Sequence, residues 1–305
     1  MRWKLKAAVQ NAIARLPEGV GNRVYFWLQR RFGGLQRVSP ISRMSAAIET
    51  WRHCQAHGLD PVGKTFLEIG TGHVPDAPLA YWLMGAGRVI TIDLNRYLST
   101  ELIDESISYL TAHRDEIVTM FGSLLVTDRL DAIKDHRDVL RAIEYVAPGD
   151  ASATGLVDGS VDVHTSYTTL EHVPPAALGR ILREGDRVLA ASGLFVHRVD
   201  YTDHFAHMDR TISHVNFLQY SEREWNRLAG NRFMFVNRLR HTDFVQLFEA
   251  NGRELIHVQT GTHSGVADAL RALALDKRFA SMPRDVLAIT GAWFVARPPG
   301  RRLAA

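Results

Sequence analysis

The hydrophobic pattern of the chain changes character near residue 59. From there to residue 297, short apolar runs bounded by turn residues alternate with longer amphipathic stretches, which is typical of strands alternating with helices. This alternation predicts an α/β fold with a doubly wound, mostly parallel sheet that is covered by helices on both faces and binds ligands at the carboxyl ends of its strands. The runs expected to be strands are residues 65–70, 89–93, 143–146, 161–165, 193–199, 254–259 and 286–296.

Two connections in this region are longer than ordinary crossovers. Residues 95–142 are charge-rich with a helical pattern, and residues 200–240 are polar and irregular. We therefore expect residues 59–297 to form one core domain that carries both segments as insertions. Residues 298–305 begin with two prolines and are expected to form a loose tail.

Residues 1–58 precede the alternating region and differ from it in charge. Helical spacing of apolar residues over 3–16 and 20–32 predicts a helical extension, and residues 1–45 carry a charge of +8 in a chain whose total is +3. The extension is also aromatic. We expect its helices to pack on the core with a solvated basic face. The alternatives are a membrane-surface anchor through residues 1–32 and a lid over an anionic substrate.

Composition argues against several other classes. The longest run without Asp, Glu, Lys or Arg, residues 255–267, is too short to span a bilayer, and no nucleic-acid-binding signature is present. The single cysteine, Cys54, cannot form an internal disulfide and suits a reducing compartment. We expect a cytoplasmic protein, with peripheral membrane contact through residues 1–32 as the alternative given above.

Residues 66–76 form a candidate nucleotide-binding loop. An apolar run containing Glu68 ends in Gly70 and Gly72, and an apolar helical pattern follows. A tight turn from strand to helix leaves the first helix amides unpaired, and glycines let a ligand touch the backbone. The next predicted strand ends in Asp93, about twenty residues further on, where a carboxylate can accept hydrogen bonds from ribose hydroxyls.

The acidic-x-Gly-x-Gly loop, with an acid at the end of the next strand, resembles class I S-adenosylmethionine-dependent methyltransferases of the small-molecule type. Two further blocks follow in the order that this family has: Asp150-Ala151 after the third predicted strand, and residues 158–173, which include a Glu-His pair, at the fourth. The resemblance implies a Rossmann-like sheet of seven strands with the last one antiparallel. It also implies S-adenosyl-L-methionine as cofactor and methyl transfer as the activity.

The resemblance assigns residues to the cofactor as well. The loop backbone is expected to hold the methionine part, Asp93 the ribose, and Asp150-Ala151 the adenine amino group and ring nitrogen. Val74 stands where the family usually has a third glycine. The residues expected to bind the cofactor are Glu68, Gly70, Thr71, Gly72, Asp93, Leu94, Asp150 and Ala151.

Two histidines are candidates for a general base. His172 belongs to the Glu-His pair after the fourth predicted strand, and imidazole titrates near neutral pH; a packing role suits the sequence equally well. His204, in the second insertion, is the alternative base. Because that insertion is rich in groups that bind hydroxyls or anions, we expect a small or glycan-like polar acceptor, methylated on oxygen. The expected acceptor-binding residues are Tyr167, Glu171, His207 and Arg238.

Two other interpretations stay open. His204 and His207 stand three residues apart, and on a helix Asp200 would lie one turn earlier, so a metal-dependent enzyme with a two-histidine, one-carboxylate site is conceivable on the same fold. A polar substrate-binding loop explains these residues too, and we prefer it. The other interpretation is a non-catalytic scaffold that keeps the cofactor-binding fold.

Overall fold

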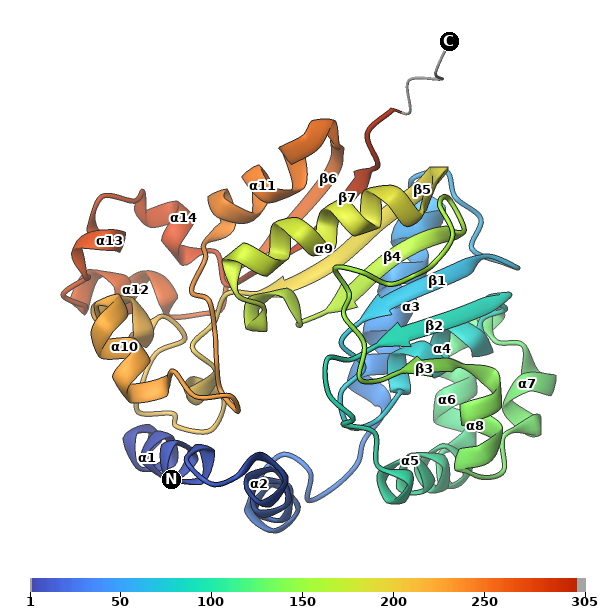
Figure 1. Ribbon diagram of the computed structural model, residues 1–305, viewed down its shortest axis with the longest axis horizontal. Coiled ribbons are helices and arrows are strands. Elements are labelled where there is room, and N and C mark those ends of the chain that lie inside the picture. Colours follow the sequence, from blue (N-terminus) through green and yellow to red (C-terminus); the bar gives the residue numbers. More distant parts are fainter. Residues whose placement is uncertain (1, 301–305) are drawn as a thin grey trace.

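The computed structural model describes residues 2–300 and has a seven-stranded sheet at its centre (Figure 1). The strand order is β3-β2-β1-β4-β5-β7-β6, in which β7 runs antiparallel to both neighbours and the other pairs are parallel. The α/β fold with an antiparallel last strand is therefore confirmed. The strands are β1 (Thr65–Ile69), β2 (Arg88–Ile92), β3 (Glu144–Val146), β4 (Val161–Tyr167), β5 (Leu189–Asp200), β6 (Glu254–Gly261) and β7 (Gly291–Arg297).

The last strand begins later than its apolar pattern indicated. The start of the predicted strand 286–296 lies instead in the short helix α14 (Arg284–Ala288), and β7 begins only at Gly291. Pro283 precedes α14 with a φ of −56°, a backbone angle that suits the entry to a helix. The hydrophobic run alone could not separate a buried helical turn from a buried strand.

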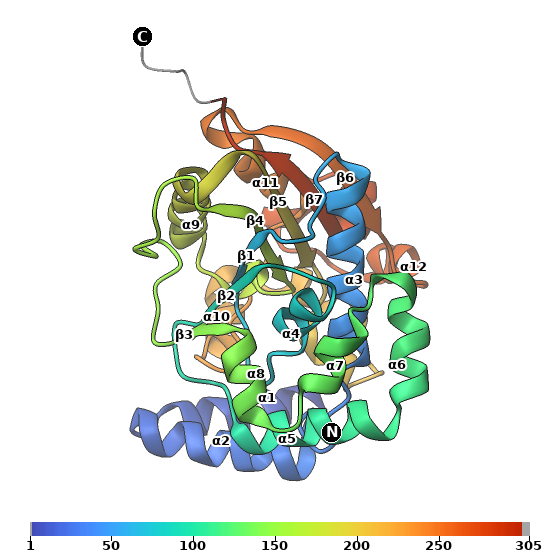
Figure 2. The same ribbon diagram turned by 90° about the vertical axis from the view of Figure 1, so that its right-hand side faces the viewer.

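Alternate residues of the central strands face two different cores. Phe66 and Val89 belong to one buried apolar cluster, and Leu67 and Ile90 to another. Since successive strand side chains point to opposite faces, the sheet needs helices on both sides. Figure 2 shows α3 on one side of the sheet and α9 on the other. The covering helices are α3 (Ile41–Ala56), α4 (Asp76–Leu83) and α5 (Thr100–Ala112) for the first core, and α9 (Pro175–Val188) and α11 (His241–Glu249) for the second.

Both predicted insertions fold into helical layers beside the sheet. The first consists of α5, α6 (Arg114–Phe121), η1 (Gly122–Leu124), α7 (Thr127–Ala132) and α8 (His136–Ala142). The second joins the segment after β6 around a third apolar core. The elements of that region are η3 (His204–His207), η4 (Asn216–Gln219), α10 (Glu222–Ala229), α12 (Val266–Ala272), α13 (Lys277–Ala280) and α14, whereas η5 (Ala250–Gly252) connects α11 to β6.

The N-terminal helices α1 (Trp3–Ala14) and α2 (Glu18–Phe32) lie together, apart from the strands (Figure 1). Trp3 packs against Phe205 of the second insertion, with ring centroids 5.4 Å apart. Arg30 on α2 forms an ion pair with α5 of the first insertion. The two helices therefore bridge the insertions on the side of the sheet where the parallel strands end. Within residues 2–300, no helix is long and apolar enough to cross a membrane.

Candidate active site

The loop between β1 and α4 has a backbone conformation that glycine adopts most easily. Gly70 and Gly72 have φ angles of 87° and 77°. A Cβ atom on Gly70 would lie 2.4 Å from the Thr169 side chain, so this loop touches the loop after β4. A Cβ atom on Gly72 would have one neighbour within 4 Å in the described chain, Arg43, at 3.9 Å. The loop therefore offers a bare backbone to a ligand at Gly72.

Buried polar side chains support the loop from beneath. The hydroxyl of Thr91 donates a hydrogen bond of 2.8 Å to the Glu68 carboxyl, and Thr91 also hydrogen-bonds Thr71. Burial raises the pKa of Glu68 to about 8, so its carboxyl is mostly neutral at pH 7. Glu68 thus stabilises the loop from inside the protein, and its role toward a cofactor is indirect in this geometry.

Asp93 stands directly after β2, at the strand end where the sequence places it. The Gly72 amide donates a hydrogen bond of 3.0 Å to its carboxylate, which ties the acid to the loop. Burial raises the pKa of Asp93 to about 6, although hydrogen bonds from Gly72 and Tyr145 oppose the change. The next residue, Leu94, is 70% exposed. The ionisable carboxyl group of Asp93 and the exposed apolar side chain of Leu94 are therefore adjacent in the chain.

The turn after β3 brings a second acid to the same edge. The Gly149 amide donates a hydrogen bond of 2.8 Å to the main-chain carbonyl of Asp93. The exposed Asp150 accepts one of 2.8 Å from the Ser152 amide, and hydrogen bonds from Ser152 lower the pKa of Asp150. Ala151 beside it is buried. The loop, Asp93 and Asp150 thus converge at neighbouring strand ends.

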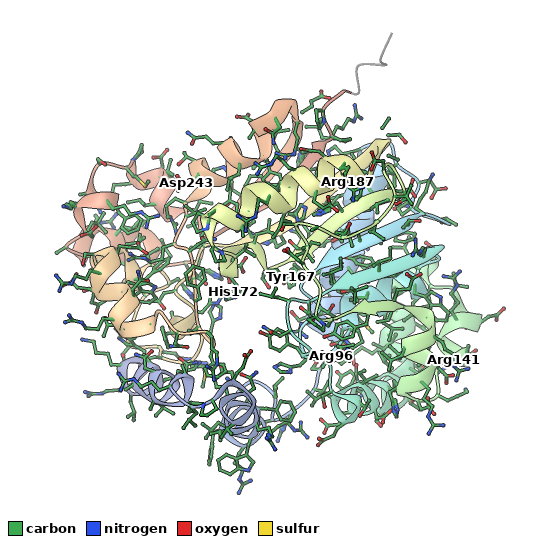
Figure 3. The ribbon with its side chains drawn as sticks, in the orientation of Figure 1. Arg96, Arg141, Tyr167, His172, Arg187 and Asp243 are labelled. Atoms are coloured by element: carbon green, nitrogen blue, oxygen red, sulfur yellow. The ribbon has the colours of Figure 1, made fainter. Side chains whose placement is uncertain are left out.

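Two histidines meet after β4 and β5. His172 lies in the 3-10 helix η2 (Leu170–His172), and His204 lies in η3. Their ring centroids are 4.8 Å apart. Nδ1 of His172 lies 2.7 Å from the Phe235 carbonyl oxygen; because a carbonyl can only accept, Nδ1 carries the proton and Nε2 the lone pair. Figure 3 shows His172 and Tyr167 near the centre of the molecule.

Glu171, beside these rings, is 1% exposed, and neither of its carboxyl oxygens has a hydrogen-bond partner among residues 2–300. Burial and the neighbouring charge of Asp200 raise its pKa well above the usual value. Burial acts to raise the pKa of Asp200 as well, but the interaction with the nearby His204 and hydrogen bonds from Thr202 outweigh it and lower that pKa. Two carboxyl groups whose pKa values are shifted in opposite directions therefore lie near each other.

The helical arrangement considered for Asp200, His204 and His207 holds only for the two histidines. Asp200 is the last residue of β5, and only the two histidines share η3. The three side chains still meet, because the Nε2 atoms of His204 and His207 lie 3.5 and 3.8 Å from Oδ2 of Asp200. The turn between β5 and η3 therefore brings Asp200 close to the two histidines, as a continuous helix would also have done.

The region from β1 to β5 matches a known family. Residues 67–197 match the family model described as methyltransferase domain, and they contain the glycine loop, Asp93, Asp150 and His172. These residues form a class I S-adenosylmethionine-dependent methyltransferase domain. No curated protein matches the chain.

Solved structures similar to this methyltransferase are distant in sequence. A methyltransferase from Methanosarcina mazei is 18% identical with a TM-score of 0.46, covering 80% of this chain and 96% of its own. Geranyl diphosphate C-methyltransferase from Streptomyces coelicolor A3(2) is 13% identical with a TM-score of 0.45, covering 83% and 80%. A protein from Pyrococcus horikoshii OT3 is 14% identical with a TM-score of 0.46, covering 83% and 90%. Similarity at this level says nothing about the acceptor.

The cofactor of the methyltransferase is S-adenosyl-L-methionine, and the groups around the loop fit it. The bare backbone at Gly72 suits close approach of the methionine part, and Asp93 can accept hydrogen bonds from the ribose hydroxyls. The exposed Leu94 side chain can cover the adenine ring, with Asp150 at its exocyclic amine. Each assignment to a single residue stays a prediction.

Arg43 is a further residue of this site that the sequence did not single out. It lies on α3, 27 positions before Gly70, yet its guanidinium approaches Gly72 and the Val74 carbonyl oxygen, the latter at 3.5 Å. In sequence it appeared only as one of many basic residues of the N-terminal region. A guanidinium in front of the loop is placed to pair with the cofactor's methionine carboxylate.

Replacing Arg43 with alanine is expected to weaken S-adenosylmethionine binding about tenfold, the effect of losing one charge-assisted contact. Binding of 5′-methylthioadenosine, which lacks the amino-acid carboxylate, should be unchanged. Calorimetric titration of both ligands measures the difference, and Arg52→Ala, an exposed arginine on the same helix, is the matched control. Equal losses for both ligands would assign Arg43 to the loop structure instead.

Arg238 is not placed to bind an acceptor, contrary to the prediction. Its side chain is 1% exposed. The guanidinium donates to the carbonyl oxygens of Phe217 and Tyr220, at 3.0 and 2.7 Å, and to Glu222 at 2.7 Å. Arg238 therefore holds the second insertion together. An arginine-rich sequence cannot distinguish such an internal role from an anion clamp.

The two surface hollows described in the structure lie along α5. Their volumes are about 530 and 870 Å³, and they are bordered by His136 in one case and by Arg30 and Tyr109 in the other. Neither is lined by the glycine loop or by the two histidines. These two hollows therefore do not mark the glycine loop or the two histidines.

Proposed function

We propose that this methyltransferase methylates an oxygen atom of a small or glycan-like polar acceptor. The observation that carries the proposal is the free Nε2 of His172, next to His204, at the end of β4. Thr169 lies in the same connection and touches Gly70 of the cofactor loop. A hydroxyl bound between the loop and the histidines would therefore find a base within reach, as oxygen methylation requires.

The bound cofactor supplies an activated methyl group, so the protein needs chiefly to align the acceptor and remove its proton. The acceptor oxygen forms a bond to the methyl carbon as the sulfur–carbon bond breaks. The hydroxyl proton passes to Nε2 of His172, with His204 as the alternative base. Tyr167, Glu171 and His207 are proposed to orient the polar groups of the acceptor.

Release of S-adenosylhomocysteine tests the proposal. The full chain is incubated with S-adenosylmethionine and a panel of methyl glycosides and sugar nucleotides, and the methylated atom is identified by mass spectrometry and NMR. We expect turnover with at least one hydroxyl-rich acceptor. Calorimetry that detects binding of NAD and none of S-adenosylmethionine would contradict the proposal, as would methylation of nitrogen or carbon alone.

We also propose a cytoplasmic location with peripheral contact to anionic membranes through α1 and α2. Leu5 and Trp27 on these helices are 58% and 57% exposed, and Phe32 at the end of α2 is as exposed as Trp27. Exposed basic residues such as Lys4 lie among them. Apolar side chains flanked by cations suit insertion at the level of anionic headgroups.

A double variant, Leu5→Ala with Trp27→Ala, is expected to reduce binding to phosphatidylglycerol-containing vesicles at least tenfold, because both side chains would leave the acyl boundary. Vesicle co-sedimentation measures it, and phosphatidylcholine vesicles should bind weakly throughout. Val157→Ala removes an apolar side chain elsewhere that is even more exposed, at 75%, and is the control. Binding that is unaffected by the double variant would show that α1 and α2 only pack on the insertions.

A further inference from the structure

We infer that Glu171, His172 and His204 form a binding site for one divalent transition-metal ion. One possible ligand atom from each residue lies within 4.8 Å of the other two. Two imidazoles and one carboxylate make a donor set that suits ions such as Zn²⁺ or Mn²⁺ better than Mg²⁺ or Ca²⁺, which prefer oxygen ligands alone. The residues come from two separate connections, after β4 and after β5.

The state of Glu171 is the strongest support. Its side chain is buried, and both carboxyl oxygens lack a hydrogen-bond partner within residues 2–300, an arrangement that native proteins rarely leave unfilled. The charged groups that act on it are Asp200, another acid with the larger effect, and the more weakly acting Arg198. A cation between the two carboxyl groups would satisfy the unpartnered oxygens and remove the repulsion.

The two histidines also have the features of ligands. Nδ1 of His172 is bound to the Phe235 carbonyl oxygen, the type of contact that fixes the tautomer and orientation of metal-binding imidazoles. Nε2 of His204 is buried and makes no hydrogen bond within the described chain. It lies 3.5 Å from Asp200, which is placed as a further oxygen donor or as the partner that orients His204.

Binding needs only a small contraction of the cluster. Ligand atoms about 2.1 Å from a tetrahedral ion lie roughly 3.4 Å apart, whereas here they lie within 4.8 Å of one another. His172 ends η2 and His204 begins η3. Rotations about their side-chain bonds, each moving a nitrogen by roughly 1 Å, would bring the atoms into range without moving the sheet.

A bound ion would also change how the acceptor loses its proton, and this consequence rests on the proposed function. An acceptor hydroxyl on the ion would have a lowered pKa and release its proton to water. The imidazoles would then act as ligands, and the new oxygen–carbon bond would form as before. Metal binding itself does not depend on the identity of the acceptor.

The test is a titration of the full chain with Zn²⁺ and with Mn²⁺ after removal of bound metal by EDTA. We expect one ion per chain by calorimetry, with affinity lowered at least tenfold in Glu171→Gln, His172→Ala and His204→Ala. Mg²⁺ should bind much more weakly. Absence of stoichiometric binding by either ion, or unchanged affinity in all three variants, would overturn the inference.

A second group of histidines provides the matched control. His53, His57 and His257 lie together, with ring centroids 5.0 to 6.3 Å apart, and His53 also lies beside Trp293. His257→Ala should leave the affinity unchanged; loss of the ion in this variant would assign the binding to that group instead.

Folding and cofactor binding are measured on the same variants. Circular dichroism and S-adenosylmethionine titration show whether a variant is intact; if Glu171→Gln does not fold, the partly exposed His204 gives the decisive substitution. Metal-free protein that methylates its acceptor at full rate would leave the proposed function standing and restrict the ion to another role. Metal-dependent binding without any methyl transfer would support the site and contradict the proposed function.

Discussion

Replacing His172 with alanine is expected to lower kcat about 10²- to 10⁴-fold, the usual contribution of a positioned group that takes up a proton. The variant loses Nε2, the nitrogen left free by the bond from Nδ1 to the Phe235 carbonyl oxygen. Affinity for S-adenosylmethionine should be unchanged, because the ring lies beyond the loop that holds the cofactor. Release of S-adenosylhomocysteine at saturating cofactor measures kcat, and calorimetry measures the affinity.

His204→Ala is the necessary companion, because its ring is 4.8 Å from that of His172. The larger of the two losses identifies the residue that carries the proton or holds an ion, and the two effects are not expected to add. His53→Ala, a partly buried histidine on α3, should leave turnover unchanged. Full activity in both His172→Ala and His204→Ala would rule out proton removal at this cluster.

The sequence predicted the strand ends of this methyltransferase well, because the patterns there are local. The glycine loop, Asp93 and Asp150 each follow directly on a short apolar run, and the topology of a parallel sheet then brings consecutive strand ends together. The long first insertion was recognised from its length and charge. Its exact helices were not, since a charge-rich pattern does not mark where each helix ends.

Contacts between distant segments were beyond the sequence. The approach of Arg43 to Gly72 depends on how α3 packs against α4, and no spacing rule gives that angle. Glu171 was predicted to bind the acceptor, but its complete burial beside Asp200 follows from the path of the second insertion. Arg238 was also predicted to bind the acceptor but is an internal residue. Its carbonyl partners come from segments without any sequence signature for binding an arginine.

Substituting Asp93 with alanine is expected to raise the dissociation constant for S-adenosylmethionine about 100-fold. Two ribose hydroxyls would lose a charged acceptor, each such hydrogen bond being worth about 1.5–3 kcal/mol, and tenfold in affinity corresponds to about 1.4 kcal/mol. The variant also frees the Gly72 amide, which now donates to Asp93, so the loop loses part of its support. Calorimetric titration of the folded variant measures the change.

The pH dependence of S-adenosylmethionine binding shows whether the charge of Asp93, rather than the size of its side chain, is needed for affinity. Burial raises its pKa to about 6, and the ribose hydroxyls prefer the ionised carboxylate. Affinity should therefore be constant above pH 7 and fall as the pH drops through 6, because the free protein takes up a proton that binding must displace. Asp93→Asn keeps the size of the side chain and should bind weakly with no such dependence. A wild-type affinity that is flat from pH 7.5 to 5, or an Asp93→Asn variant that keeps the same pH dependence, would mean that the ribose contacts a different group.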